Sequence, residues 1–337
     1  MRTIFTALIS VIILSFASCT RNNFREFSGL TWGTTYHIVY NSPVDLNDSI
    51  LAELERVDNS LSMFNPLSTL SAINSSLTTR PDKYVADVIK ISQKANKLSD
   101  GAFDPTVEPL VNLWGFGSTD RELGSTPSDS AIARALRRVG ITDCYITSDG
   151  ILIKKHPLTR FDFSGVAKGY GVNRVARMLE RNGCADFKVE IGGEVVLQGL
   201  NPSGKPWRIK IEAPNPDPSI SEELCIKAFG PEVTSIASSG NYRNFRTDSL
   251  GNRYGHTISP RTGRPIQSDV LSATVILPGS YCGLADALAT AAMVLPSDSA
   301  SAMLRSAGAA AILVIGVGPS ERRTIEVNPD SPLFAQK

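Results

Sequence analysis

The chain has few of the residues that mark zinc-binding or nucleic-acid-binding proteins. Its 337 residues include five cysteines and three histidines. No two cysteines form a CxxC pair, and no histidine lies at metal-site spacing from a cysteine. The formal net charge is only +1. Such a balance gives no support for binding nucleic acid or for a broad basic membrane-binding patch.

The marked apolar run at the N-terminus is too short for a comfortable transmembrane helix. Arg2 is followed by an apolar stretch over 4–16, and then by Ala17 and Ser18 before Cys19. A charged start, a short apolar core and small residues before a cleavage point are typical of a secretory signal. The cysteine resembles that of a bacterial lipoprotein signal, in which Cys19 becomes the lipidated first residue. The alternative is an ordinary cleaved signal with an incidental cysteine.

These features predict an exported protein, anchored by lipid to a membrane on its periplasmic or extracytoplasmic face. We expect a signal peptide at 1–18, a lipidated N-terminus and tether at 19–30, and one folded domain over 31–330. With 42% hydrophobic and 20% charged residues, the chain has the composition of an ordinary globular protein.

Hydrophobic periodicity predicts an α+β fold with mainly antiparallel sheets and packed helices, because helices and hairpins alternate without a regular βαβ repeat. NPSGKP (201–206) is expected to join two strands as a hairpin. The predicted helices cover 45–62, 82–98, 127–139, 166–181, 282–295 and 297–307. The predicted strands cover 34–40, 187–191, 194–199, 207–212, 224–229, 233–237, 270–277 and 311–317.

A rigid loop at 254–265, YGHTISPRTGRP, holds one of the few histidines. Pro260 and Pro265 fix backbone dihedrals, and His256 has arginines at 253, 261 and 264 around it. This pattern favours a loop that positions groups for an anionic ligand. The alternative is a tight turn whose histidine only caps a strand.

A glycine-rich helix start at 162–171, DFSGVAKGYG, is a second candidate. Asp162 and Ser164 are good capping residues, and a helix start with Lys168 in the same turn suits phosphate. The order GxxxxGK[ST] of a P-loop is not present in this segment. The alternative is a site where a helix packs closely on a strand.

Asp286 and Thr290 lie four residues apart in ADALATAA (285–292), so on a helix both oxygens face the same side. A carboxylate and a hydroxyl there can hold a hard cation such as Mg²⁺. The alternative gives Asp286 to the helix dipole and Thr290 to a bond with its own backbone.

Two further segments carry candidate groups. GAFDPTVEPLVNLWGFG (101–117) places aromatic residues between fixed turns, where they can stack on a flat ring or simply pack in the core. EIGGE (190–194) carries Glu190 and Glu194 on either side of a glycine pair. These are either acid–base groups or part of a surface hairpin.

Taken in order, these segments resemble the FAD:protein FMN transferases, the ApbE-type flavin transferases. The resemblance spans nearly all of the chain after the signal. The matching segments are TWGTTY (31–36), LSMFNPLSTLSAIN (61–74), GAFDPTVEPLVNLWGFG (101–117), DFSGVAKGYGVNRVA (162–176), VEIGGEV (189–195), PWRIKIE (206–212), SSGNYRNF (238–245), HTISPRTGRP (256–265) and ADALATA (285–291).

The resemblance implies an ApbE-like, T-fold-related architecture and a flavin transferase catalytic domain over 31–330. It implies an enzyme that uses Mg²⁺ and takes FAD as substrate. Such an enzyme cleaves the FAD pyrophosphate, moves FMN onto a Thr or Ser hydroxyl of a target protein and releases AMP. Membrane redox subunits that carry covalent FMN are the expected targets. Alternatives are a Mg²⁺-dependent FAD pyrophosphatase and a non-catalytic FAD-binding lipoprotein.

The resemblance also implies roles for individual residues. Mg²⁺ is expected at Asp286, Thr290 and a backbone carbonyl near Gly165. His256 matches the family histidine near the reacting phosphates, and either His256 or Asp286 is expected to accept the proton of the incoming hydroxyl. The expected FAD contacts are Trp32, Phe64, Ala102, Phe103, Asp104, Asp162, Lys168, Thr257 and Ile258. The chain departs from many members at Trp32, Phe64 and Ser259, where Met, Tyr and Asp are more usual.

Overall fold

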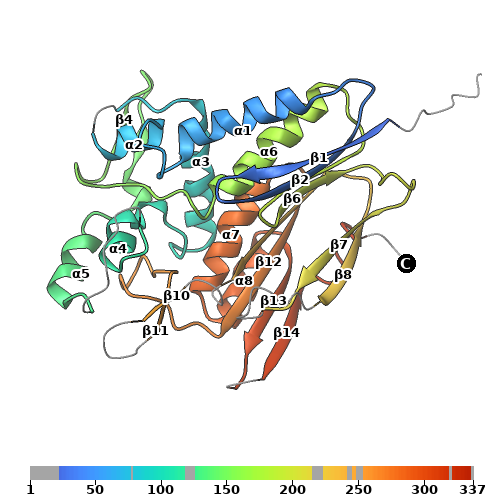
Figure 1. The fold of residues 1–337 in the computed structure, drawn as a ribbon. Coiled ribbons are helices and arrows are strands. Elements are labelled where there is room, and N and C mark those ends of the chain that lie inside the picture. The colour runs from blue at the N-terminus through green and yellow to red at the C-terminus, as the bar shows by residue number, and fades with distance from the viewer. Residues whose placement is uncertain are drawn as a thin grey trace, which may run out of the picture.

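An eight-stranded antiparallel sheet forms the centre of the fold (Figure 1). The computed structural model describes residues 23–76, 79–117, 126–214, 223–240, 245–247, 253–318 and 321–334. The strands follow the order β1-β2-β5-β6-β9-β12-β13-β14, and each neighbouring pair is antiparallel. Their bounds are β1 Phe24–Thr31, β2 Thr34–Asn41, β5 Phe187–Ile191, β6 Glu194–Gln198, β9 Thr234–Gly240, β12 Val270–Pro278, β13 Ala310–Gly316 and β14 Arg322–Val327.

Helices cover one face of this sheet, and a hairpin covers part of the other (Figure 1). The hairpin is made of β7 (Trp207–Glu212) and β8 (Glu223–Phe229), and it packs Trp207 and Phe229 against Leu197 of the sheet. Two more small pairs are β3 Tyr145–Ile146 with β4 Leu152–Ile153, and β10 Phe245–Thr247 with β11 Arg253–Gly255. The helices are α1 Asn47–Leu61, α2 Thr69–Asn74, α3 Lys83–Leu98, α4 Glu108–Leu113, α5 Asp129–Leu136, α6 Ala167–Arg181, α7 Cys282–Val294 and α8 Ser297–Ser306, with 3-10 turns at Pro105–Val107 and Ile141–Asp143.

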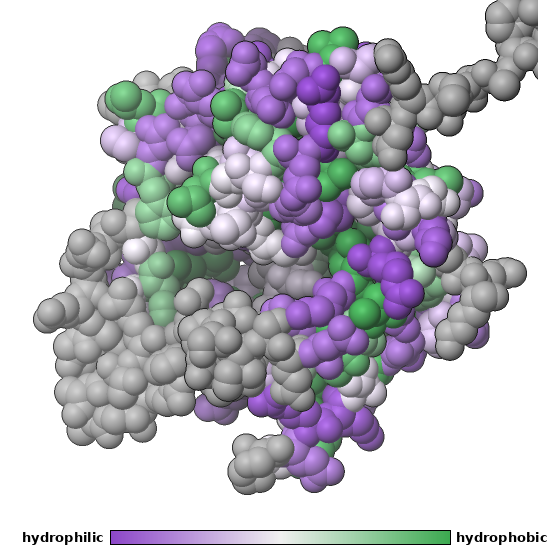
Figure 2. Space-filling view, turned by 45° about the vertical axis from the view of Figure 1, so that its right-hand side comes forward, coloured by the Kyte–Doolittle hydropathy of each residue, from purple (hydrophilic) through white to green (hydrophobic). Residues whose placement is uncertain are grey.

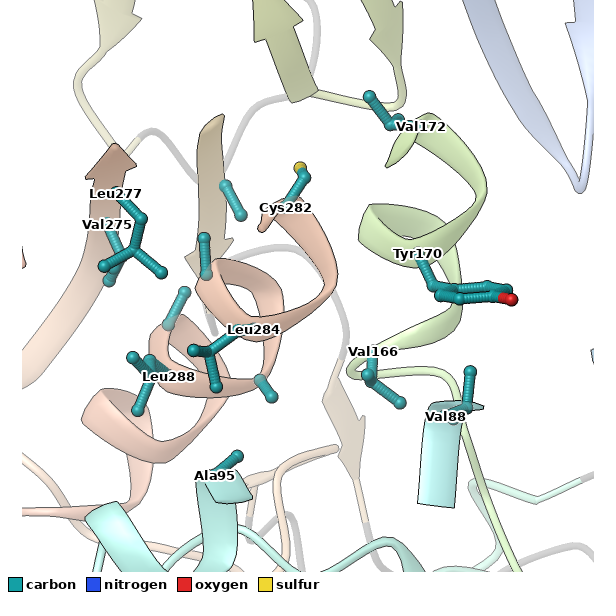
Figure 3. Close-up of a cluster of buried hydrophobic side chains, with 14 of the residues drawn as sticks. Val88, Ala95, Val166, Tyr170, Val172, Val275, Leu277, Cys282, Leu284 and Leu288 are labelled. Atoms are coloured by element: carbon teal, nitrogen blue, oxygen red, sulfur yellow. The ribbon is translucent and has the colours of Figure 1, made fainter. Parts of the chain in front are cut away.

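Helix α7 is the centre of the hydrophobic core. It carries almost no polar residue, and such a helix must be buried on all sides. Leu284 and Leu288 are buried beside Val275 of β12, while α6 and α3 lie against the helix on the other side (Figure 3). The few polar side chains that α7 does carry, Asp286 among them, are therefore held in a dry and closely packed environment.

The sequence predicted most of these elements. The α+β class is confirmed. Helix α3 begins directly after Asp82, as expected, because the Asp82 side chain accepts the Val85 N–H at 2.9 Å and so caps the helix. The turn expected at 201–206 forms and closes one antiparallel bridge between residues 200 and 206. The expected hairpin of β6 with β7 extends no further, because β7 pairs with β8 in a separate two-stranded sheet.

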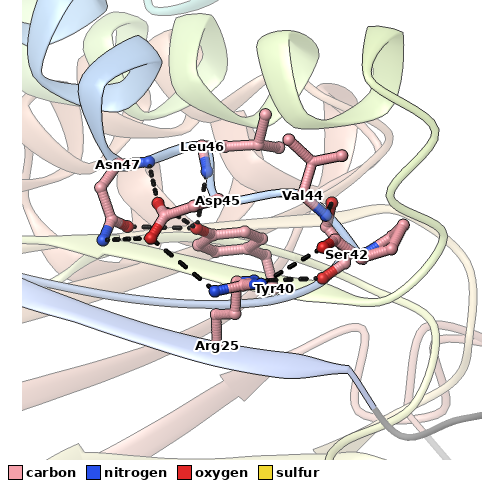
Figure 4. A network of polar contacts seen from close by, with 8 residues as sticks. Arg25, Tyr40, Ser42, Val44, Asp45, Leu46 and Asn47 are labelled. Carbon is pink, nitrogen blue, oxygen red and sulfur yellow. Dashed lines mark hydrogen bonds and ion pairs between the residues drawn. The ribbon is translucent and has the colours of Figure 1, made fainter.

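The tether expected over 19–30 is also wrong in its second half. Residues 24–31 form β1, which pairs with β2 along its whole length. Arg25 fastens the start of the strand, since its Nε donates to the Ser42 carbonyl and its guanidinium lies 3.7 Å from Asp45 (Figure 4). The signal peptide at 1–18 and the expected lipidation site Cys19 lie outside the described residues.

The surface gives no sign of a membrane-spanning element within the described residues. No helix among them combines the length and apolar character needed to cross a bilayer. On the face shown in Figure 2, hydrophilic residues are interspersed with small apolar patches.

A buried carboxylate joins three helices beside the core. Glu53 of α1 is 2% exposed and accepts hydrogen bonds from Arg174 of α6 at 2.7 Å, Tyr84 of α3 at 3.1 Å and Arg56 at 2.8 Å. Burial alone would raise the pKa of Glu53, but these partners lower it below its ordinary value. The ionised carboxylate thus stabilises the fold above its unfolded pKa, and this contribution is lost as the pH falls through its folded pKa.

Replacing Glu53 by Gln should therefore lower the free energy of unfolding by about 3 kcal/mol at neutral pH, because Arg174 then loses the ionised partner of a buried pair. Urea unfolding followed by circular dichroism measures this. The difference from the wild type should shrink as the pH falls. Glu55→Gln, on the exposed face of the same helix, is the control and should change stability by less than about 0.5 kcal/mol. Equal stability of both variants would contradict the role of Glu53.

Candidate active site

The starts of α6 and α7 meet at a contact that only glycine allows. A Cβ at Gly169 would lie 2.4 Å from the Cys282 carbonyl oxygen and 2.8 Å from Asp286 Cβ. In this close approach the Gly169 N–H donates to Asp286 Oδ2 at 3.0 Å. Asp286 is 2% exposed, so its carboxylate is fixed where the two helices touch.

Two cavities adjoin this contact. One, of about 500 Å³, lies between the β1–β2 turn, α1 and the start of α6, and the other, of about 410 Å³, lies between α7, β9 and the 254–265 loop. Ser164 and Lys168 line both cavities. The cavities therefore adjoin at the first turn of α6, with a lysine between them.

The structure brings the expected site residues together around these cavities, although their roles in binding and catalysis remain predictions. Trp32 and Phe64 line the first cavity. The second cavity is lined by Ala102, Phe103, Asp104, Asp162, Gly165, Lys168, His256, Thr257, Ile258, Asp286 and Thr290.

Lys168 forms a short ion pair with Glu194, one of the two glutamates that the sequence left open between an acid–base role and a surface hairpin. Its Nζ lies 2.6 Å from Oε1 of Glu194, a side chain that is 1% exposed. Burial raises the pKa of Glu194 above its ordinary value, and the charge of Lys168 opposes this rise. Glu190 instead pairs with Lys188 and is 38% exposed. The surface-hairpin alternative is therefore wrong for Glu194.

The lysine remains charged in this setting. Burial by itself would lower the pKa of Lys168, but the charges of Asp286 and Glu194 raise it above its ordinary value. Burial also raises the pKa of Asp286, and the Lys168 charge and the Gly169 N–H oppose that rise. The junction thus holds one ammonium and two buried carboxyl groups.

The residues expected at a cation lie close enough to form one site. A Cβ at Gly165 would come within 2.9 Å of Thr290 Oγ1, so the backbone at Gly165 passes directly beside this hydroxyl. Thr290 lies one turn from Asp286 on α7. The described residues contain no cluster of three or more His, Cys, Asp or Glu side chains able to hold a metal. One carboxylate, one hydroxyl and one carbonyl suit Mg²⁺, which keeps several waters and shares substrate phosphates.

The start of α6 differs from the expectation. The helix begins at Ala167 after Val166, which makes no side-chain cap. Asp162 instead accepts the Ser164 N–H at 2.8 Å within the preceding turn. Capping by Asp162 and Ser164 is therefore wrong, because the chain makes an extra turn between these residues and the helix.

The loop around His256 is held in place by a contact with the 101–117 segment. Trp114 is 1% exposed, and its Nε1 donates to the Gly263 carbonyl at 2.8 Å. Gly263 has φ +67°, a conformation that favours glycine. For Trp114 the core-packing alternative is therefore correct, and this packing fixes the loop that carries His256.

The arginines of this loop do not converge on the cavities. Arg261 pairs with Asp100 at 2.6 Å, and Arg264 pairs with Asp129. Neither lines a cavity described above, and the side chain of the third arginine, at 253, lies outside the described side chains. The expectation that Arg261 and Arg264 surround an anionic ligand is wrong, because both tie the loop to neighbouring helices and turns.

Asp104 serves the fold as well as the cavity wall. Its carboxylate accepts hydrogen bonds from the Thr106 N–H and hydroxyl and from the Ile141 N–H.

Sequence reasoning missed two residues that line the cavities, Asp58 of α1 in the first and Ser239 of β9 in the second. Nothing in the sequence distinguishes Asp58, whereas the SSG run at 238–240 was visible as a polar segment.

Known proteins match both the sequence and the fold. The sequence profile of the ApbE family matches residues 32–313. The chain is 38% identical over 314 residues to the FAD:protein FMN transferase of Vibrio cholerae, with 90% of each chain covered. It superposes on the flavin transferase ApbE from Vibrio cholerae with a TM-score of 0.79 at 35% identity, covering 92% of this chain and 99% of that one. The flavinyl transferase ApbE of Pseudomonas stutzeri, in its apo form, gives a TM-score of 0.81 at 32% identity, with 93% and 98% covered. The expected architecture is thereby confirmed.

Replacing Gly169 by Ala should push α6 and α7 apart, because the new Cβ meets backbone atoms of Cys282 that cannot move aside alone. We expect a loss of about 2 kcal/mol in the free energy of unfolding, as for other overpacked cores, measured by denaturant unfolding. Gly316→Ala is the matched control, since a Cβ there would lie 3.7 Å from Leu271, an ordinary contact. A Gly169→Ala variant as stable as the control would contradict the close contact.

Proposed function

The chain belongs to the ApbE family, and we propose that it is a flavin transferase, which moves FMN from FAD onto a Thr or Ser hydroxyl of a target protein and releases AMP. In this reaction the hydroxyl oxygen bonds to the phosphorus of the FMN half as the pyrophosphate bond breaks. The hydroxyl proton leaves to a base, and AMP carries away the bridging oxygen.

The observation that carries this proposal is the pair of adjoining cavities with Lys168 between them. FAD has two flat ring systems joined through a pyrophosphate, so it needs two apolar recesses with a cation at their junction. The first cavity offers Trp32, Phe64 and Phe163 as apolar walls. Lys168 binds the pyrophosphate, and its charge offsets the negative charge that develops there during transfer.

Asp286, Thr290 and a backbone carbonyl near Gly165 would hold Mg²⁺, which when bound would neutralise phosphate charge. The fit rests on their proximity and on the burial of Asp286, whose carboxylate has only one hydrogen bond among the described contacts, from the Gly169 N–H.

His256 orients or deprotonates the incoming hydroxyl. It lines the same cavity as Lys168 and Asp286, and imidazole is suited to accept a proton near neutral pH. Asp286 is the less suitable base, because its carboxylate is bonded to Gly169 and assigned to the cation.

The sequence supports a place for this enzyme outside the cytoplasm, anchored through Cys19 to a membrane. Membrane redox subunits that carry covalent FMN are its targets. An anchor of this kind keeps the enzyme on the same surface as such subunits.

Hydrolysis of FAD to FMN and AMP is the second candidate. It is favoured by Phe64, which lies at the wall of the first cavity with 74% of its surface exposed. An open mouth there gives water access to the bound dinucleotide.

Incubating the purified protein with FAD, Mg²⁺ and a Thr-containing target fragment tests the proposal. We expect covalent flavin fluorescence on the target, a mass increase equal to one FMN residue, and AMP in equal amount. AMP without labelled target would favour the hydrolase instead.

Asp286→Ala should abolish the Mg²⁺-dependent reaction, since it removes the one carboxylate of the proposed cation site. Unchanged FAD with the wild-type protein, or full activity in this variant, would contradict the assignment.

His256→Ala should lower the labelling rate about 100-fold or more, as expected for the loss of a general base. FAD affinity, measured by fluorescence titration, should change far less than the rate. His37→Gln is the control, because the His37 ring forms a hydrogen bond with Glu26 at the surface, and His37 lines neither cavity. A parallel loss of affinity and rate in His256→Ala would assign this histidine to binding alone.

A further inference from the structure

Glu194 is a buried acid with no role in the activity proposed above. It follows the turn at Gly192 and Gly193, which have φ of +62° and +95°, and it begins β6, between β5 and β9. Its side chain therefore starts from one of the central strands of the sheet. Its Oε1 lies 2.6 Å from Lys168 Nζ, while its Oε2 is buried and has no hydrogen-bond partner among the residues that the structure describes. Burying a carboxylate oxygen without a hydrogen bond is unfavourable for the free energy of folding, so this placement calls for an explanation.

Lys168 has two carboxylates within electrostatic reach but pairs with one of them. The charges of Asp286 and Glu194 both act on it. Within the described part of the chain, its only carboxylate within 4.0 Å is Glu194. Asp286 is instead bonded to the Gly169 N–H. The two acids approach from different layers, Glu194 from the sheet and Asp286 from α7.

We infer that Glu194 is a positioning residue that holds the Lys168 ammonium away from Asp286, so that the Asp286 carboxylate stays open to a divalent cation. Without Glu194, the half-buried ammonium would turn to the remaining carboxylate. An ammonium paired with Asp286 competes directly with the cation for its oxygens. With Glu194 in place, lysine and cation occupy separate positions beside the same pyrophosphate. The inference rests on the proposed function, because it takes Asp286 as a cation ligand.

The glutamate also fixes where the lysine can reach. Lys168 lines both cavities, and a free lysine side chain has many rotamers to lose on binding. The short bond to a side chain rooted in the sheet removes this freedom before the ligand arrives. Lys168 is thereby held at the junction rather than in either cavity.

Direct cation binding tests the inference without any turnover. Mn²⁺ is titrated into the protein alone, and the electron paramagnetic resonance signal of free Mn²⁺ gives the dissociation constant. We expect Glu194→Gln to raise this constant at least tenfold. Glu190→Gln is the matched control from the same strand pair, and it should bind Mn²⁺ like the wild type, since Glu190 pairs with Lys188.

Two further measurements separate position from charge and from folding. Glu194→Asp keeps the charge but is one methylene shorter, so its constant should rise toward that of Glu194→Gln if position matters. A crystal structure of Glu194→Gln should show Lys168 Nζ within hydrogen-bond distance of Asp286. A purely structural role would lower the melting temperature and leave the Mn²⁺ constant of the folded protein unchanged.

The results also distinguish this inference from the proposed function. If wild type binds Mn²⁺, Asp286→Ala does not, and Glu194→Gln binds as tightly as wild type, the cation site stands and the role of Glu194 is overturned. If Glu194→Asp binds like wild type while Glu194→Gln does not, charge alone explains the effect and the positioning role is overturned. If wild type fails to bind Mn²⁺, the cation site itself fails, and this inference falls with it.

Discussion

The contact between Gly169 of α6 and Asp286 of α7 is the constraint on which the rest of the site depends. Because no side chain separates the helices there, the Gly169 N–H reaches the Asp286 carboxylate at 3.0 Å. The same contact sets the position of Lys168, the neighbour of Gly169. The acid, the lysine and the wall between the two cavities therefore follow from one close packing of two helices.

Such packing is possible because the two helices differ in how they are buried. Helix α7 is buried on all sides and contributes core contacts, so it can hold a carboxylate in a dry position. Helix α6 is amphipathic and lies between α7 and α1. Its outer side is joined to α1 and α3 through the Glu53–Arg174 pair. Burying charge at the site is unfavourable, and these contacts outside the site offset that cost.

The sequence predicted the groups of the site better than their connections. Local patterns sufficed for α3 and α7, because helical periodicity and capping are properties of neighbouring residues. They did not suffice for the pairing of β7 with β8 or for the inclusion of residues 24–31 in the sheet. In both cases the partner is the next strand along the chain, so the information was local, but the sequence pattern did not single out these pairings. Glu194 was ambiguous for a different reason, since only contacts far along the chain, between the assembled sheet and α6, decide that it is buried beside Lys168.

Long-range contacts also hold the two kinds of element that carry the site, regular secondary structure and a loop. Asp286, Thr290 and Glu194 stand on a buried helix and a central strand, where packing fixes their directions. His256 instead stands on a loop that is held through Trp114 and Gly263. Groups that bind a fixed phosphate charge benefit from the rigid positions. The role proposed for His256 suits a loop, because a loop at the protein surface can reach a hydroxyl that arrives on another protein.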